Sequence, residues 1–316
     1  MLNLPIIYKV LGTLLYLEAL LFGVCMSLGV WYGETNYATF GVPIVIALAL
    51  GTALRFFGRH AENRMGRRDG FLIVSLTWVI FSFIGMLPLL ISGYQPRVAA
   101  AFFEIMSGFT TTGATALTNI DSLPASILLW RSLTHWFGGM GIVFFTIAIL
   151  PNIGGGETKL FSAEATGLKI GKLHPRIGTT ARWIWSLYLL LTLTCMGAYY
   201  LAGMSVFDAV NHGFSTIGTG GFSTHQDSIA YFQSNTIEWI TAIFMFLAGV
   251  NCTLLYLLFI KRRMKDVIRD EELRCYLFLF LGAVAGITGI LYFVDNLDFS
   301  TALRLSLIHI SEPTRR

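Results

Sequence analysis

Long apolar runs separated by short polar segments dominate the chain. A helix needs roughly 20 apolar residues to cross a hydrocarbon core of ~30 Å. Seven runs approach or exceed that length, at approximately residues 6–30, 41–57, 71–92, 127–150, 183–203, 237–260 and 275–294. The pattern predicts an all-α polytopic membrane protein. The first run is too long for a cleaved signal peptide, and no small-residue cleavage site follows it before Trp31, so we expect it to remain in the mature protein.

Composition supports the same fold class and excludes several functions. Hydrophobic residues make up 55% of the chain and charged residues only 13%, whereas soluble domains carry about 25% charged residues. The four cysteines are scattered, with no CxxC or Cys/His cluster, so neither a metal site nor a disulfide framework is predicted. A membrane-embedded enzyme would need a paired acid, base or metal cluster facing one pocket. The sequence has no such constellation, and we predict that the protein is not an enzyme.

Basic residues alternate between successive loops. Three loops hold most of the 22 lysines and arginines, namely residues 55–68, 159–182 and 261–274, and the intervening loops hold only Arg97. By the positive-inside rule the three basic loops are cytoplasmic, which also predicts a cytoplasmic N-terminus. The net charge of +4 is therefore a topology signal. It predicts the lipid bilayer as a partner and no nucleic acid.

An internal repeat carries the candidate chemistry. The string GFTTTG at residues 108–113 reappears 105 residues later as GFSTIG at residues 213–218. Each copy follows a spanning run and a short apolar segment, about 97–109 or 205–214, and precedes another spanning run. The short segments cannot cross a bilayer. We therefore predict repeated units of membrane helix, pore half-helix, filter loop and membrane helix, with both loops entering from the outer side.

The residue types in the repeat suit the coordination of a monovalent cation. A chain that enters the membrane and returns is tolerated only where it is buried in protein or lines water. Glycine permits the backbone angles that point successive carbonyls the same way, and rings of such oxygens can replace the hydration shell of an ion. Small residues of this kind also serve helix packing. Two copies in the same topological position favour the pore-loop interpretation.

At this point the chain resembles a known family. The segments SGFTTTGATAL (107–117), RSLTHWFGGMGIVFFTIAILP (131–151), FSTIGTGGFSTH (214–225) and FMFLAGVNCTLLY (244–256) are similar to the Trk/Ktr/HKT superfamily, and within it to its TrkH-type potassium-uptake subunits. The resemblance implies four pore units around one ion path, preceded by two extra transmembrane helices. The first unit would span 71–150 and the second 183–260.

The resemblance also implies the site and its partners. Family filters place backbone carbonyls around potassium, and the matching positions are Thr111, Thr112, Gly113, Thr216, Ile217 and Gly218. Glycine in both filters favours potassium over sodium. Potassium is then the substrate, and no cofactor is expected in this chain. The family works with a cytosolic nucleotide-binding regulatory subunit, and we expect a homodimer in the bacterial inner membrane.

The expected organisation has five parts. They are the N-terminal helix pair and basic loop (1–69), the first unit and linker (70–182), the second unit and basic segment (183–274), the start of a third unit (275–306) and a tail (307–316). The tail breaks the family pattern, so we expect a reading frame truncated in its third repeat and a non-native ending. Two alternatives remain, a sodium- or potassium-conducting two-loop subunit that dimerises, and an inactive fragment.

Five polar residues in apolar surroundings complete the expectations. Glu104, in the first half-helix, is a candidate for direct ion contact, for attracting cations or for a structural role. His135 and His212 are expected to be hydrogen-bonded structural histidines. Asn251 is expected to bond to a neighbouring helix. Glu18 either extends to the membrane surface or pairs with another helix.

Overall fold

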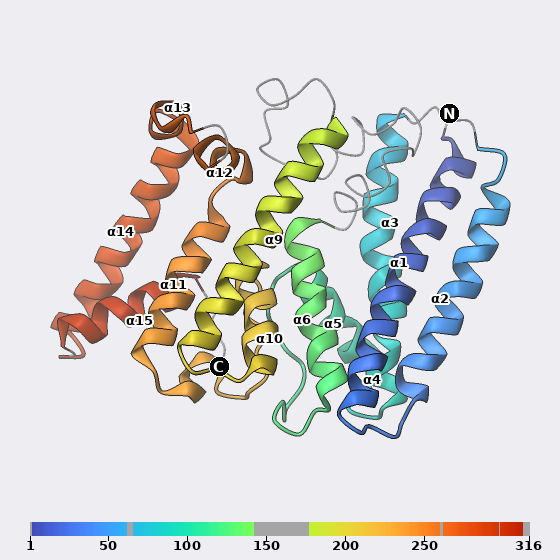
Figure 1. Cartoon of the computed structure of the whole chain (residues 1–316), viewed down its shortest axis with the longest axis horizontal. Helices are drawn as coiled ribbons and strands as arrows, with labels where there is room; N and C mark the ends of the chain where they lie inside the picture. The colour runs from blue at the N-terminus through green and yellow to red at the C-terminus, as the bar shows by residue number, and fades with distance from the viewer. Residues whose placement is uncertain (1, 62–65, 142–176, 260–261, 297, 312–316) are drawn as a thin grey trace.

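A computed structural model describes residues 2–61, 66–141, 177–259, 262–296 and 298–311. In these residues all regular secondary structure is helical, as the apolar pattern predicts (Figure 1). The helices are α1 (Leu4–Trp31), α2 (Ala38–Phe57), α3 (Arg67–Gly85), α4 (Leu87–Ile91), α5 (Val98–Phe109), α6 (Ala125–Met140), α9 (Ile177–Leu201), α10 (Val206–Ile217), η2 (Ser228–Phe232), α11 (Asn235–Gly249), α12 (Cys252–Phe259), α13 (Met264–Ile268), α14 (Glu271–Phe293) and α15 (Phe299–Ser311).

Five helical segments within these residues are long and apolar enough to cross a membrane. They are Leu4–Trp31, Ala38–Phe57, Arg68–Ile91, Arg182–Leu201 and Glu271–Phe293. Each coincides with one of the predicted apolar runs. The chain is therefore a multi-pass membrane protein of the predicted fold class.

The run 237–260 is not a single long helix. α11 ends at Gly249, Val250 is extended, and α12 begins at Cys252. Tyr276 of α14 explains this break, because its hydroxyl donates to the carbonyl of Phe246 (3.2 Å) and would lie 2.7 Å from a Cβ on Gly249. The run 237–260 is thus interrupted near its middle by a close contact with the next helix.

Parts of the sequence predictions lie outside the described residues. These are residues 62–65 of the first basic loop, the end of the run 127–150, most of the linker and its basic residues up to residue 176, residues 260–261 and 297, and the last residues of the tail. α6 is described as far as Met140 and ends at Gly141, which has a φ of +74°.

The helices form two similar units beside an N-terminal hairpin. We call α3 to α6 the first unit and α9 to α11 the second unit; α5 and α10 are the short helices of the two units (Figure 1). The N-terminus, the end of α2 and α13 lie at the upper edge of Figure 1, and the turn between α1 and α2 lies at the lower edge. Two basic segments thus share a face with the N-terminus, as the charge alternation predicts.

A partly buried carboxylate joins the hairpin to the first unit. Glu34 follows α1, and its side chain accepts hydrogen bonds from the backbone N–H of Ser126 (3.0 Å) and from the Ser126 hydroxyl. Ser126 lies in the first turn of α6, where backbone N–H groups have no partner within the helix and where negative charge is favourable. Glu34 therefore fixes the start of α6 against α1.

A third short helix follows α14 at the position where the sequence predicts another half-helix. α15 packs against α14, and the hydroxyls of Thr288 and Ser306 are 2.8 Å apart. An ion pair between Arg304 of α15 and Glu238 of α11 joins this region to the second unit. The order of long helix and short helix is thus repeated a third time.

Candidate functional site: two re-entrant loops

The first loop leaves α5 through a tight turn. The N–H of Thr111 donates to the carbonyl of Gly108 (3.0 Å), and that of Thr112 donates to the carbonyl of Ser107 (2.9 Å). Thr111 has a φ of +53° and Gly113 a φ of +74°. A positive φ is costly for threonine but open to glycine. After this turn the chain is no longer helical until α6 begins at Ala125.

The second loop leaves α10 through the same turn, three residues later than the string repeat predicts. The N–H of Thr219 donates to the carbonyl of Thr216 (3.1 Å), and that of Gly220 donates to the carbonyl of Ser215 (3.0 Å). Thr219 has a φ of +56° and Gly221 a φ of +86°. Each feature therefore recurs at a spacing of 108 residues, which pairs Thr111 with Thr219 and Gly113 with Gly221.

The structure places the three residues predicted for the second filter at the end of α10 rather than in the loop that follows. Thr216 and Ile217 are the last residues of α10, and Gly218 caps that helix. The hydroxyl of Thr216 is 2.8 Å from the hydroxyl of Tyr199, and Ile217 is 2% exposed. Gly218 packs so closely on α6 that its Cα would lie 2.7 Å from a Cβ on Gly139. All three residues pack behind the loop.

The difference between the two registers has a simple physical origin. A shift of three residues is close to one helical turn of 3.6 residues, so the string GFSTIG matched helical residues of α10 to residues at and beyond the end of α5. The residues missed are Thr219, Gly220 and Gly221. The shared spacing of glycine and hydroxyl residue in Gly113–Thr115 and in Gly221–Ser223 was the signal that could have found them.

Glu104 supports the first loop from behind. It is fully buried, and its Oε2 accepts hydrogen bonds from the N–H of Ala116 (2.7 Å) and from the hydroxyl of Thr115 (2.9 Å). Its Oε1 pairs with Nε of Arg131 at 2.9 Å. Of the three roles expected for Glu104, the structure therefore shows the structural one.

His212 takes the equivalent place in the second unit, 108 residues after Glu104. Its Nε2 is 3.0 Å from the hydroxyl of Ser223, and its Nδ1 is 2.9 Å from the carbonyl of Asp208. The Ser223 hydroxyl accepts from the N–H of His225 (3.0 Å), as the Thr115 hydroxyl accepts from the N–H of Leu117 (3.3 Å). The expectation of a hydrogen-bonded structural histidine is confirmed.

His135 of α6 lies against the second loop. Its Nδ1 is 3.1 Å from the hydroxyl of Ser215, and its ring stacks on that of Phe222 with centroids 4.0 Å apart. The expectation for this histidine is also confirmed. A Cβ on Gly220 would lie 2.2 Å from the same Nδ1, so the loop backbone approaches the ring as closely as only glycine permits.

The expectations for Asn251 and Glu18 have different outcomes. The amide of Asn251 donates to Glu272 of α14 at 3.0 Å, so the predicted bond to a neighbouring helix is confirmed. Glu18 is fully buried, which excludes extension to the membrane surface. Its carboxylate oxygens have no hydrogen-bond partner among the described residues, and it lies near Gly85 of α3.

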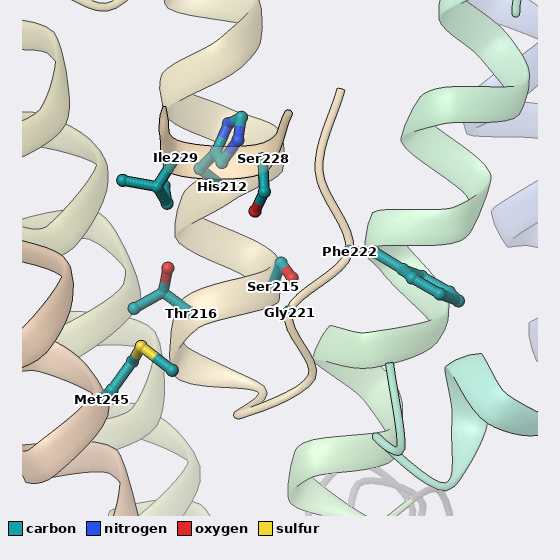
Figure 2. A pocket seen from close by; sticks show the side chains of 8 residues that line it. All are labelled: His212, Ser215, Thr216, Gly221, Phe222, Ser228, Ile229 and Met245. Atoms are coloured by element: carbon teal, nitrogen blue, oxygen red, sulfur yellow. The ribbon is translucent and has the colours of Figure 1, made fainter. Parts of the chain in front are cut away.

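A small cavity lies behind the second loop, on the side away from α6 (Figure 2). Its volume is about 10 Å³, and its lining residues are His212, Ser215, Thr216, Gly221, Phe222, Ser228, Ile229 and Met245. The ring of Phe222 points away from it, toward α6 (Figure 2). A polar cavity of this size holds about one water molecule.

The outer ends of the two loops are joined by charged and polar groups. Nδ1 of His225 is 3.2 Å from Asp121, which follows the first loop, and its Nε2 is 3.4 Å from Asp208. The N–H of Ile120 donates to the side chain of Gln226 at 3.1 Å. Segments about 105 residues apart in the sequence therefore form one rim.

Comparison with known proteins assigns this arrangement to a family. Residues 38–302 match the sequence model of TrkH, described as a cation transport protein. The chain belongs to the TrkH family. Its relatives include the "Trk system potassium uptake protein TrkH" of Salmonella typhimurium, 43% identical over 84% of this chain and 56% of the relative, and that of Halomonas elongata, 39% identical over 95% and 62%.

A solved TrkH structure has the same fold. The crystal structure of the potassium transporter TrkH from Vibrio parahaemolyticus matches with a TM-score of 0.81 and 34% identity, over 96% of this chain and 62% of that chain. The chain thus spans little more than half the length of the TrkH relatives it matches. The TrkH family is one of cation transport proteins, in agreement with the prediction that the chain is not an enzyme.

Proposed function

We propose that this chain contributes two pore loops to a potassium-uptake protein of the bacterial inner membrane. The observation that carries the proposal is the repeated turn. In both loops a threonine and a glycine with positive φ follow the end of a short helix, at a spacing of 108 residues. Successive carbonyls in such a stretch can take the place of an ion's hydration shell. The names of the curated relatives support potassium as the ion.

The proposed ion-coordinating positions follow the corrected register. They are Thr111, Thr112 and Gly113 in the first loop and Thr219, Gly220 and Gly221 in the second. Thr112 and Thr219 are exposed, whereas Thr216, Ile217 and Gly218 are buried. Coordination and release require no bond-breaking step, so a transported ion is the only small molecule that the proposal needs.

The membrane orientation and the partners belong to the same proposal. We place the N-terminus in the cytoplasm, because basic segments lie on its face and positive loops stay inside. The five sequence parts (1–69, 70–182, 183–274, 275–306 and 307–316) remain our division of the chain. By resemblance to the superfamily we also propose that the protein forms a homodimer and binds a cytosolic nucleotide-binding regulatory subunit. By the same resemblance, four pore loops are needed to close a ring around the ion.

The test is cation uptake in bacteria that lack their own potassium-uptake systems. Two proteins are compared, the chain as it stands and a chimera that continues it after residue 302 with the C-terminal part of the Salmonella relative. We expect rubidium uptake by the chimera. Uptake by the chain alone would favour a two-loop subunit that dimerises, and uptake by neither, with both inserted in the membrane, would refute the potassium proposal.

The corrected register is tested in the same chimera. Gly113→Ser and Gly221→Ser should each lower the ratio of rubidium to sodium uptake by about tenfold or more, because a side chain at a left-handed glycine disturbs the carbonyl positions. Thr216→Val is the matched control, since it keeps the shape of a residue that faces Tyr199. A ratio changed by Thr216→Val and unchanged by Gly221→Ser would restore the original register.

A further inference from the structure

One arginine contacts both pore loops. Arg131 lies on α6 of the first unit and is 1% exposed. Its Nε pairs with Glu104 at 2.9 Å, and its Nη2 donates to the hydroxyl of Thr115 in the first loop at 3.4 Å. Its Nη1 donates to the carbonyl of Ser223 in the second loop at 3.2 Å. All three nitrogens of the guanidinium group are therefore engaged, and they connect segments about 100 residues apart.

The second loop reaches back to the same face of α6. The guanidinium carbon of Arg131 lies 4.2 Å from the ring centroid of Phe222, and the ring of His135 stacks on the same Phe222 ring with centroids 4.0 Å apart. Arg131 and His135 are four residues apart, so they lie on one face of the helix. Figure 2 shows the Phe222 ring directed at this helix. Phe222 immediately follows Gly221, the proposed ion-coordinating glycine.

We propose that Arg131 and His135, which belong to the first unit, are positioning residues that fix the position of the second loop. Glu104 holds the side chain of Arg131 in place. The inference rests on the proposed potassium pathway and deepens it. A guanidinium group presents its donors in a fixed planar arrangement. Because it binds the Ser223 carbonyl on one side and the Glu104 and Thr115 oxygens on the other, the distance between the two loops is held constant. The two loops therefore act as one rigid element in ion selection.

A purely structural role is the competing explanation. Buried ion pairs often contribute little net stability, and apolar replacements of both partners can be tolerated. In that case the pair would only hold α5 against α6, and its loss would change the amount of folded protein without changing which ion passes. The ratio of rubidium to sodium uptake separates the two explanations, because it does not depend on the amount of protein in the membrane.

The experiment uses the chimera and measures that ratio together with protein abundance in the membrane. Arg131→Lys keeps the charge but not the fork of donors, and we expect the ratio to fall about tenfold. Phe222→Leu removes the aromatic contact while keeping an apolar side chain, and we expect a smaller fall in the same direction. Arg182→Lys, the same exchange at an exposed arginine of α9, is the matched control and should leave the ratio unchanged.

A double variant, Glu104→Met with Arg131→Met, completes the design. It removes the buried charges together, so the protein can fold, but it also removes the donor to Ser223. We expect the ratio to stay low. The inference would be overturned if this double variant had the same ratio as the unaltered chimera. It would also be overturned if Arg131→Lys and Phe222→Leu both left the ratio unchanged. If Arg131→Lys fails to reach the membrane, the ratio for Phe222→Leu decides. Loss of uptake by the unaltered chimera would refute the potassium proposal itself.

Discussion

The two pore loops share a backbone but differ in what supports it. In the first loop a buried ion pair, Glu104–Arg131, holds the segment that follows Gly113. In the second loop the hydroxyl of Ser223 bonds to His212 and its carbonyl accepts from Arg131, and a cavity of about 10 Å³ remains. The first loop is therefore held by an ion pair of its own unit, and the second by a histidine of its own unit together with Arg131 of the first unit. The backbone geometry is what the two units have in common, and the side chains behind it have diverged.

The support is also asymmetric between units. Arg131 of the first unit donates to the carbonyl of Ser223 in the second loop. Of the two loops, the second thus depends on a charged residue of its neighbour. The comparison predicts unequal sensitivity to substitution, with the largest effects at the charged group.

The largest effect is expected from removing one member of the ion pair. Glu104→Ala leaves Arg131 buried without its carboxylate and should lower the free energy of unfolding by about 3–5 kcal/mol. His212→Ala, the matched change in the second unit, removes two side-chain hydrogen bonds and should cost about 1–3 kcal/mol. Thermal unfolding of the detergent-purified protein, followed by tryptophan fluorescence, measures both. Equal losses would show that charge plays no special part in the first loop.

An intermediate effect is expected where loop or helix backbones touch α6. A Cβ on Gly138 would lie 2.1 Å from the carbonyl of Phe109, and one on Gly220 would lie 2.2 Å from the ring of His135. Gly138→Ala and Gly220→Ala should each cost about 1–3 kcal/mol through overpacking.

Gly197 of α9 supplies the control for these alanine variants. Among the described residues, no atom outside the neighbouring backbone of α9 lies within 4 Å of a Cβ placed there, and alanine is the better helix former. Gly197→Ala should therefore leave the midpoint of thermal unfolding unchanged or raise it. Tolerance of alanine at Gly220 together with intolerance at Gly138 would mean that the second loop is loosely seated, contrary to the close contact described above.

The smallest effect concerns the starts of the two short helices. The hydroxyl of Ser205 accepts from the N–H of Asp208 (3.0 Å) and caps α10, whereas Arg97 precedes α5 without a side-chain cap bond. Ser205→Ala should lower the free energy of unfolding by about 1 kcal/mol, and Arg97→Ala should change it by less than about 0.5 kcal/mol. A loss at Arg97 as large as that at Ser205 would contradict the assigned difference between the caps.

Most of the fold followed from local sequence properties. Apolar runs predicted the spanning helices α1, α2, α3, α9 and α14 within a few residues, because length and hydropathy alone decide whether a helix can cross a membrane. The half-helices α5, α10 and α15 were also located. The interruption at Gly249 was not predicted as a break between two helices, since it depends on the contact with Tyr276 of α14.

The sequence located the residues of the first loop but not those of the second. Thr111, Thr112 and Gly113 lie in the first loop as expected, but string similarity placed the second filter on Thr216, Ile217 and Gly218. Sequence identity between two segments carries no information on where a helix ends, because the end of α10 is set by capping and packing against α6 and α9. The hydrogen bonds and backbone angles of the two turns select the spacing of 108 residues over that of 105.

The sequence by itself determined that this protein spans a membrane several times, that its units repeat and that glycine- and threonine-rich loops interrupt them. Those properties depend on composition and period, which each segment carries alone. Only the tertiary structure decided which residues occupy equivalent places and that Arg131 connects the loops. The equivalent places and the Arg131 contacts both involve segments about 100 residues apart. The packing of whole helices, rather than any local pattern, fixes how these segments meet.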